Sequence, residues 1–115
     1  FETVAPEVLD QLGFIYATGS FVDPIDPRTV SFIRKYRETY DTEADDFAFL
    51  GFDVTFFYVK ALMTRGTNFA SSFSQVDTHP ISMDFDMRRA GPENGFRNEH
   101  AIMLQLKELQ LVKAP

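Results

Sequence analysis

The sequence contains no cysteine and no tryptophan, and it has only 11 lysine and arginine residues against 17 aspartate and glutamate residues. Without cysteine, the chain can form no disulfide scaffold, no zinc–thiolate site and no cysteine nucleophile. The formal net charge is −6, and the basic residues do not form the cluster that a phosphate-binding surface needs. We therefore expect neither nucleic acid nor an anionic membrane surface as a partner.

Long hydrophobic runs are missing too, because no stretch reaches the roughly 18 consecutive apolar residues of a membrane span. Phenylalanine is abundant instead, with 13 residues among 115, and the hydrophobic fraction is 44%. That fraction is sufficient to bury a core. So many large rings need thick layers around them. We therefore predict that residues 1–115 form a single partial domain, the C-terminal segment of a larger module.

A continuous apolar run, residues 12–17 (LGFIYA), follows a short helix or turn at residues 6–12. Its length and composition are typical of a buried parallel strand. No parallel neighbour for this strand is recognisable in the sequence, which would leave its backbone groups without partners. We therefore expect the partners to come from a further segment or from dimerisation, and we predict that the isolated chain forms an oligomer.

Two helices are expected in the middle of the chain. The first spans residues 27–40, because Asp26 can cap its free N–H groups and Pro27 suits the first helical position. The second begins at Asp45 or Asp46 and ends near residue 65. The apolar residues expected on one face of the first helix are Val30, Ile33, Tyr36 and Tyr40.

The second helix is apolar around nearly its whole circumference, which predicts burial on several sides. Gly66 is a natural left-handed cap at its end. Gly51 lies inside the helix, where glycine costs about 1 kcal/mol relative to alanine. We expect Gly51 to allow the close approach of another backbone or of a ligand.

The last third of the chain changes to a two-residue period. Alternating apolar residues at 83–87 and 101–107 indicate half-buried strands, residues 91–95 have the composition of a turn, and a last short strand is expected at 109–112. A weak helix is expected at 67–74. The predicted fold class is therefore α/β, with one buried strand, two main helices and a terminal antiparallel β-meander.

Residues 31–62 (SFIRKYRETYDTEADDFAFLGFDVTFFYVKAL) resemble a stretch of the type I periplasmic binding proteins. That stretch reads F-x-x-x-Y-x-x-x-Y-x-x-x-P-x-x-(F/Y)-A-x-x-G-(F/Y)-D, and after seven intervening residues it continues with A-L. The resemblance is closest to branched-chain amino-acid binding proteins and receptor-family ligand-binding regions. The matching residues are Phe32, Tyr36, Tyr40, Phe47, Ala48, Gly51, Phe52, Asp53, Ala61 and Leu62.

The chain departs from the family pattern at Ala44 or Asp45, where the family usually has proline. This position affects how the helix starts and is not a ligand contact. The tail of the chain also resembles the end of the family, above all a divergent branch found beside peptidoglycan-binding repeats. The residues that carry this second likeness are Phe85, Asp86, Gly91, Pro92, Gly95, Phe96 and Asn98.

The resemblance implies the C-terminal portion of a type I periplasmic binding protein-like fold, in which two α/β lobes close on a small ligand. The implied function is that of an extracytoplasmic solute-binding module of the ABC-transporter substrate-binding type, exported to the periplasm or cell surface. Its expected ligand is an amino acid or a similar small polar molecule. The alternative is a degenerate binding-protein fold that serves protein–protein or cell-wall association without transport.

Five residues are candidates for ligand contact. The resemblance places Phe49 where an aromatic side chain can line the ligand cleft, and the alternative is a core phenylalanine. Thr18, Ser20 and Phe21 follow the predicted buried strand, and open α/β sheets bind ligands at the carboxyl ends of their strands. An ordinary turn is the alternative there. Asp53 is either a buried hydrogen-bond anchor or a ligand contact.

No pattern of catalytic or metal-binding residues is recognisable. Asp84 and Asp86 alternate with apolar residues, as a solvated strand face requires. His79 and His100 stand apart from any metal-ligand motif. We therefore expect that the protein is not an enzyme and that it uses neither a metal nor a cofactor.

Overall fold

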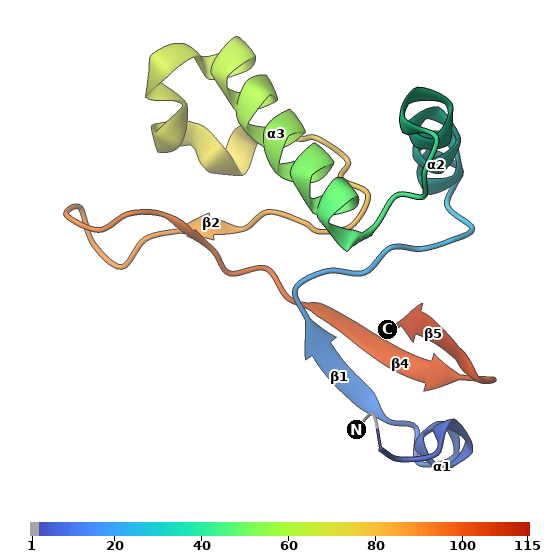
Figure 1. The fold of residues 1–115 in the computed structure, drawn as a ribbon. Coiled ribbons are helices and arrows are strands. Elements are labelled where there is room, and N and C mark those ends of the chain that lie inside the picture. The colour runs from blue at the N-terminus through green and yellow to red at the C-terminus, as the bar shows by residue number, and fades with distance from the viewer. Residues whose placement is uncertain (1–2) are drawn as a thin grey trace. The chain divides into compact units, whose positions relative to one another are not determined.

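The computed structural model describes residues 3–115, which form two compact units (Figure 1). One unit combines the two ends of the chain, up to Gly19 and from Ala101 onward, and the other spans Ser20–His100. We call them the terminal unit and the helical unit. Both combine helical segments with small antiparallel sheets or extended segments, so the coarse prediction of a mixed α/β chain is confirmed.

The terminal unit contains a short helix and a three-stranded antiparallel sheet with the strand order β1-β4-β5. Alternate residues of the central strand point into its small core, where Ile102 and Leu104 are buried. These residues belong to the predicted face of the 101–107 strand. The elements of this unit are α1 (Pro6–Gln11), β1 (Ile15–Thr18), β4 (Ile102–Lys107) and β5 (Gln110–Lys113).

The prediction of a buried parallel strand at residues 12–17 is wrong. Only Ile15–Thr18 forms a strand, and it pairs antiparallel with β4, with Ile15 opposite Gln105. The side chain of Ile15 is 47% exposed and that of Leu12 is 74% exposed. Leu12 ends α1, and Gly13 turns the chain with a φ of +61°. The backbone hydrogen-bond partners of β1 come from near the C-terminal end of the sequence. The composition of residues 12–17 does not indicate this pairing.

The hairpin between β4 and β5 turns through two residues with positive φ, Glu108 at 51° and Leu109 at 60°. Positive φ at both central residues is the geometry of a type I′ turn, which matches the twist of the strands but favours asparagine and glycine. The N–H of Glu108 donates to the side chain of Asp10 at 3.0 Å. This bond ties the turn to α1.

The helical unit confirms both predicted helices within a residue at each end. Asp26 caps the first by accepting from the N–H of Arg28 at 2.8 Å, and Asp45 caps the second by accepting from Ala48. Gly66 ends the second helix with a positive φ. The elements are α2 (Pro27–Tyr40), α3 (Asp46–Arg65), the 3-10 segment η1 (Gly66–Gln75), β2 (Met87–Arg88) and β3 (Arg97–Asn98).

The inner face of α2 differs from the predicted face. Thr29 is its only fully buried residue, and Phe32 and Tyr36 are partly buried. Val30 and Tyr40, which we had placed on the inner face, are 52% and 64% exposed. The rings of Phe32 and Phe49 are 5.1 Å apart, so contact with α3 decides which side of α2 faces inward.

The core of the helical unit is a cluster of phenylalanine rings. Phe57 of α3 is 1% exposed and stacks on Phe85 at a centroid distance of 4.1 Å. Phe73 of η1 lies 5.7 Å from Phe57 and 4.8 Å from Phe96. Residues from four separate segments therefore meet in one aromatic core.

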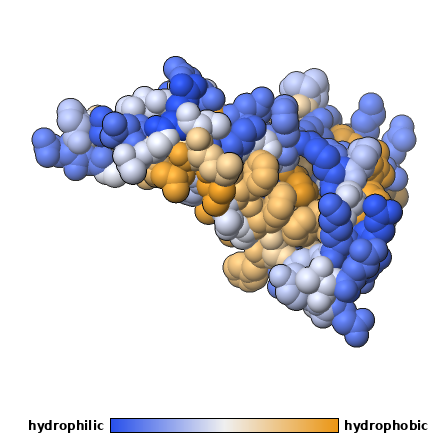
Figure 2. Space-filling view, turned by 90° about the horizontal axis from the view of Figure 1, so that it is seen from above, coloured by the Kyte–Doolittle hydropathy of each residue, from blue (hydrophilic) through white to orange (hydrophobic). Residues whose placement is uncertain are grey.

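The prediction that α3 is buried on several sides is wrong for this chain. Its buried residues repeat every four positions and form a single stripe. Figure 2, seen from above the view of Figure 1, shows hydrophobic surface bordered by hydrophilic residues. Apart from the adjoining residues and the backbone of α3 itself, no atom of the described residues would lie within 4 Å of a Cβ at position 51, so the expected close approach is not found here. The buried stripe consists of Phe49, Asp53, Phe57 and Ala61.

The predicted terminal meander is only partly correct. Within residues 83–87 only Met87 joins a strand, and β2 pairs with β3 in a separate two-stranded sheet. Beyond these two strands, the side chain of Asn98 forms the hydrogen bonds that a longer pair of strands would form through its backbone. It accepts from the N–H of Asp86 and donates to the carbonyl of Asp84, both at 2.8 Å. The two later strands pair as predicted, but β4 also pairs with β1.

Candidate functional site

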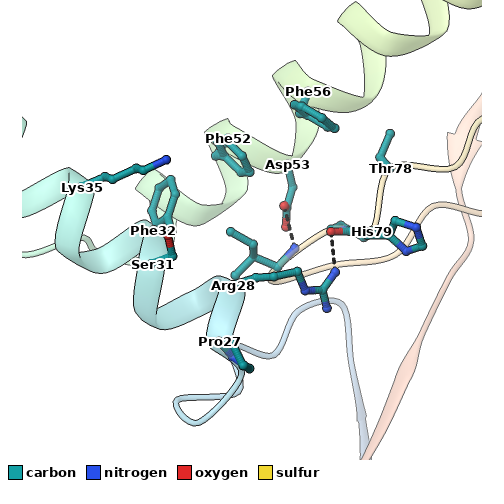
Figure 3. A pocket seen from close by; sticks show the side chains of 12 residues that line it. Pro27, Arg28, Ser31, Phe32, Lys35, Phe52, Asp53, Phe56, Thr78 and His79 are labelled. Atoms are coloured by element: carbon teal, nitrogen blue, oxygen red, sulfur yellow. Dashed lines mark hydrogen bonds between the residues drawn. The ribbon is translucent and has the colours of Figure 1, made fainter.

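A cavity of about 490 Å³ lies within the helical unit, between α2, α3 and residues 78–81 (Figure 3). Its volume falls in the range of small-molecule sites, which are mostly apolar with a few polar groups. The aromatic part of its wall consists of Phe32, Phe52 and Phe56. Their rings follow one another at centroid distances of 5.0 Å and 5.7 Å.

Asp53 holds one wall of this cavity in place. Its side chain is 1% exposed and accepts four hydrogen bonds. The N–H of Ile81 donates to one carboxylate oxygen at 2.8 Å. The N–H and hydroxyl of Ser82, at 2.6 and 2.7 Å, and the N–H of Met83, at 3.2 Å, donate to the other. Because a buried carboxylate is stable only when it is well hydrogen-bonded, this arrangement fixes residues 81–83 against α3.

Arg28, in the first turn of α2, also lines the cavity. Its guanidinium donates to both carboxylate oxygens of Asp26, and its Nη1 donates to the carbonyl of His79 at 2.7 Å. The hydrogen bond from the Arg28 side chain is the main cause that holds the pKa of Asp26 below its usual value. Arg28 therefore fastens residue 79 to the start of α2, as Figure 3 shows.

Lys35 is the second cation beside the cavity. It lies two helical turns after Arg28 on α2, and Figure 3 shows its side chain extending beside Phe32. Within residues 3–115, the ammonium group of Lys35 has no hydrogen-bond or ion-pair partner, whereas Arg28 is paired with Asp26. The cavity thus combines an aromatic wall with one cation that is available to a ligand.

The predicted ligand-contact residues occupy different places. Asp53 lines the cavity and anchors residues 81–83. Phe49 is 5% exposed and packs on Phe32, behind the aromatic wall. The N–H of Phe21 donates to the carbonyl of Ser82 at 2.7 Å. Ser20 begins the helical unit, whereas Thr18 ends β1 in the terminal unit. Only Asp53 among the five therefore lines this cavity.

The remaining cavity residues were missed in the sequence. Arg28, Phe32 and Lys35 lie three to four residues apart, so a helical face with two cations beside a ring could have been noticed. The residues of the loop at 78–81 carry no periodic signal. Their position depends on the bonds from Asp53 and Arg28, which join residues far apart in the sequence.

Both histidines and Asp86 lie beside an oppositely ionising side chain. His100 lies 3.4 Å from Asp84, and His79 lies 3.4 Å from Asp77. Asp86 forms an ion pair with Arg88 at 3.0 Å. Across residues 3–115, no group of three or more metal-ligating side chains has an arrangement suited to a metal ion.

The comparisons with known proteins found no matching family model, no matching curated protein and no matching solved structure. In the described part of the chain, one helical stretch, Asp46–Gln75, is long and apolar enough to cross a membrane by length and composition. This is weak evidence for a membrane span, because the core helix of a soluble protein can have the same properties.

Proposed function

We propose that this chain is the C-terminal part of a type I periplasmic binding protein-like module that binds an amino acid or a similar small polar solute. The module would act outside the cytoplasm, in the periplasm or at the cell surface, as the substrate-binding component of an ABC transporter. In this proposal the module recognises its ligand by closure of two lobes and carries out no covalent chemistry.

The observation that carries this proposal is the connectivity of the two units. The middle of the chain, Ser20–His100, forms one compact unit, and both ends of the chain form the other. The chain therefore passes from one unit to the other twice, near residues 19–20 and 100–101. Two bodies joined by short connections can move as rigid parts about a hinge, which is the movement that solute binding by this family requires.

The residues of the family-like stretch give further support. Asp53, of the Gly51-Phe52-Asp53 motif, is a buried anchor for residues 81–83, and Ala61 is completely buried. Phe32 packs against both Phe49 and Phe52. These roles explain physically why this stretch requires a carboxylate, a small residue and rings at these positions.

A ligand panel tests the proposal. The full-length protein is heated in the presence of single amino acids and small peptides, and its melting temperature is measured. Ligand at about a hundred times its Kd stabilises the folded state by about 2.7 kcal/mol, so a true ligand gives a clear rise. A complete panel without any rise contradicts the proposal. Ser20→Ala should reduce the rise, whereas Ser74→Ala, an exposed serine in η1, serves as its control.

The second candidate function is protein–protein or cell-wall association by a degenerate module. It is favoured by the uncovered side of α3, opposite the buried stripe, where Val59 and Leu62 are each 49% exposed. Cosedimentation of the purified protein with isolated peptidoglycan tests it, and Phe47→Ser should weaken retention. We also propose that the isolated chain oligomerises through this side. A monodisperse monomer in light scattering would contradict that.

A further inference from the structure

We propose that the cavity between α2, α3 and residues 78–81 is a separate binding site for a small carboxylate with an aromatic or aliphatic body. The apolar body would lie against the aromatic wall, and the carboxylate would lie at the ammonium group of Lys35. Every residue that lines the cavity belongs to the helical unit. The site therefore needs no movement of one unit against the other, and it goes beyond the solute binding proposed above.

The aromatic wall favours an apolar ligand body. Phe52 and Phe56 are 40% and 45% exposed, and together with Phe32 their rings form a continuous series. Exposed apolar surface is unfavourable in water, and each Å² that a ligand covers contributes roughly 25 cal/mol. A cavity of about 490 Å³ is large enough for one aromatic ring with a short side chain.

The charges at the cavity favour an anion. Lys35 has no partner among the described residues, whereas the guanidinium of Arg28 is held by Asp26 and by the carbonyl of His79. The chain carries a net charge of −6, so an unpaired cation beside an apolar cavity contrasts with its average surface. A ligand carboxylate can pair with Lys35 without breaking any contact that holds the cavity together.

A cationic ligand fits this site poorly. Asp53 is the only carboxylate on the cavity wall, and its two oxygens already accept four hydrogen bonds from residues 81–83. It cannot turn toward a bound cation without leaving buried N–H groups unpaired, which is costly. Lys35 would in addition repel a positive group. The site should therefore bind an acid more tightly than an amine that has the same apolar body.

An NMR titration of the 115-residue chain tests the inference with three probes that share one phenylpropyl body. Hydrocinnamate should cause saturable shifts at the backbone amides of residues 28–35 and of Thr78, His79 and Ile81. The corresponding alcohol should bind about fivefold more weakly, because an exposed ion pair contributes up to about 1 kcal/mol. The corresponding amine should bind more weakly than the alcohol.

Two variants locate the charge. Lys35→Gln should remove the preference for the acid over the alcohol, whereas Lys107→Gln, in the terminal unit, should leave it unchanged. The inference is overturned if no saturable shifts occur, if the amine binds as well as the acid, or if Lys35→Gln retains the preference. Shifts at these amides that grow with protein concentration alone would assign the cavity to a second copy and also overturn it. None of these outcomes affects the amino-acid panel on the full-length protein.

Discussion

The two sides of α3 carry similar side chains in opposite surroundings. Phe49 and Phe57 are 5% and 1% exposed, whereas Phe47, two residues before Phe49, is 80% exposed. Met63, in the last turn, is 81% exposed. Composition therefore does not decide which apolar residue of this helix is buried. The segments that pack against α3 determine which of its apolar residues are buried.

The covered side owes its burial to contacts that are distant in sequence. Phe32 of α2 packs on Phe49, and Phe73 and Phe85 pack on Phe57. The buried positions lie four residues apart and therefore align along one face of the helix. Within residues 3–115, no comparable layer covers the other side. This difference predicts that equal substitutions on the two sides have very unequal effects.

Truncating a phenylalanine on each side should give the largest contrast. Phe57→Ala should lower the free energy of unfolding by about 3–5 kcal/mol, because it leaves a cavity among Phe73 and Phe85. Phe47→Ala should change it by no more than about 0.5 kcal/mol at protein concentrations where the chain is monomeric. Urea denaturation of both variants measures the difference. Similar losses for the two would show that both sides of α3 are covered in solution.

Removing the charge of Asp53 should have the next largest effect. Asp53→Asn places an amide N–H₂ opposite donors of residues 81–83, so at least one buried donor loses its acceptor. We expect a loss of about 2–3 kcal/mol in the free energy of unfolding. Asp46→Asn, at an exposed position of the same helix, is the matched control and should be nearly neutral. Equal stability of Asp53→Asn and the unchanged protein would refute the anchoring role.

Gly51→Ala should stabilise the isolated chain. Nothing lies within 4 Å of the added Cβ, and alanine is favoured over glycine in a helix by about 1 kcal/mol. The measurement is the melting temperature, with Gly95→Ala, in a loop with open space, as the control. In the larger module proposed above, the gain should vanish if another layer packs against Gly51. A loss of stability in the isolated chain would mean that this side is already covered there.

The smallest effect is expected at the start of α2, away from both sides of α3. Arg28 lowers the pKa of Asp26 in the folded chain, so the ionised carboxylate is stabilised by folding. That contribution is complete above the unfolded pKa of about 3.9, and it is lost as the pH falls through the lowered folded pKa. The melting temperature of Asp26→Asn, measured from neutral pH to below about pH 4, should therefore approach that of the unchanged chain. A constant difference would contradict this pH dependence.

The helices could be predicted from sequence because their signals are local. Asp26 and Asp45 cap the helix starts, and Gly66 ends the second helix. Strand pairing was harder, because β1 pairs with residues almost ninety positions later, as the register of Ile15 with Gln105 shows. The inner face of α2 was also misplaced. Its periodicity allowed several faces, and contact between Phe32 and α3 selected one.

In the candidate site, too, the sequence indicated the residue with a local signal but not the contacts between distant segments. Asp53 was recognised because a lone carboxylate in an apolar helix requires an explanation, and the structure supplies one in residues 81–83. Arg28 and Lys35 looked like ordinary surface cations of an amphipathic helix. The bond from Arg28 to the carbonyl of His79 and the bond from Ile81 to Asp53 bring the loop at 78–81 beside them and close the cavity.

The sequence by itself determined the positions and ends of α2 and α3, the mixed α/β character, and the need for a partner to Asp53. These follow from capping, periodicity and the cost of burying a charge, which act over a few residues. The tertiary structure alone decided the partner of β1, the stripe of α3 that is covered, and the cavity beside Lys35. Each depends on contacts between segments far apart in the chain, and no local pattern of residues specifies which segments meet.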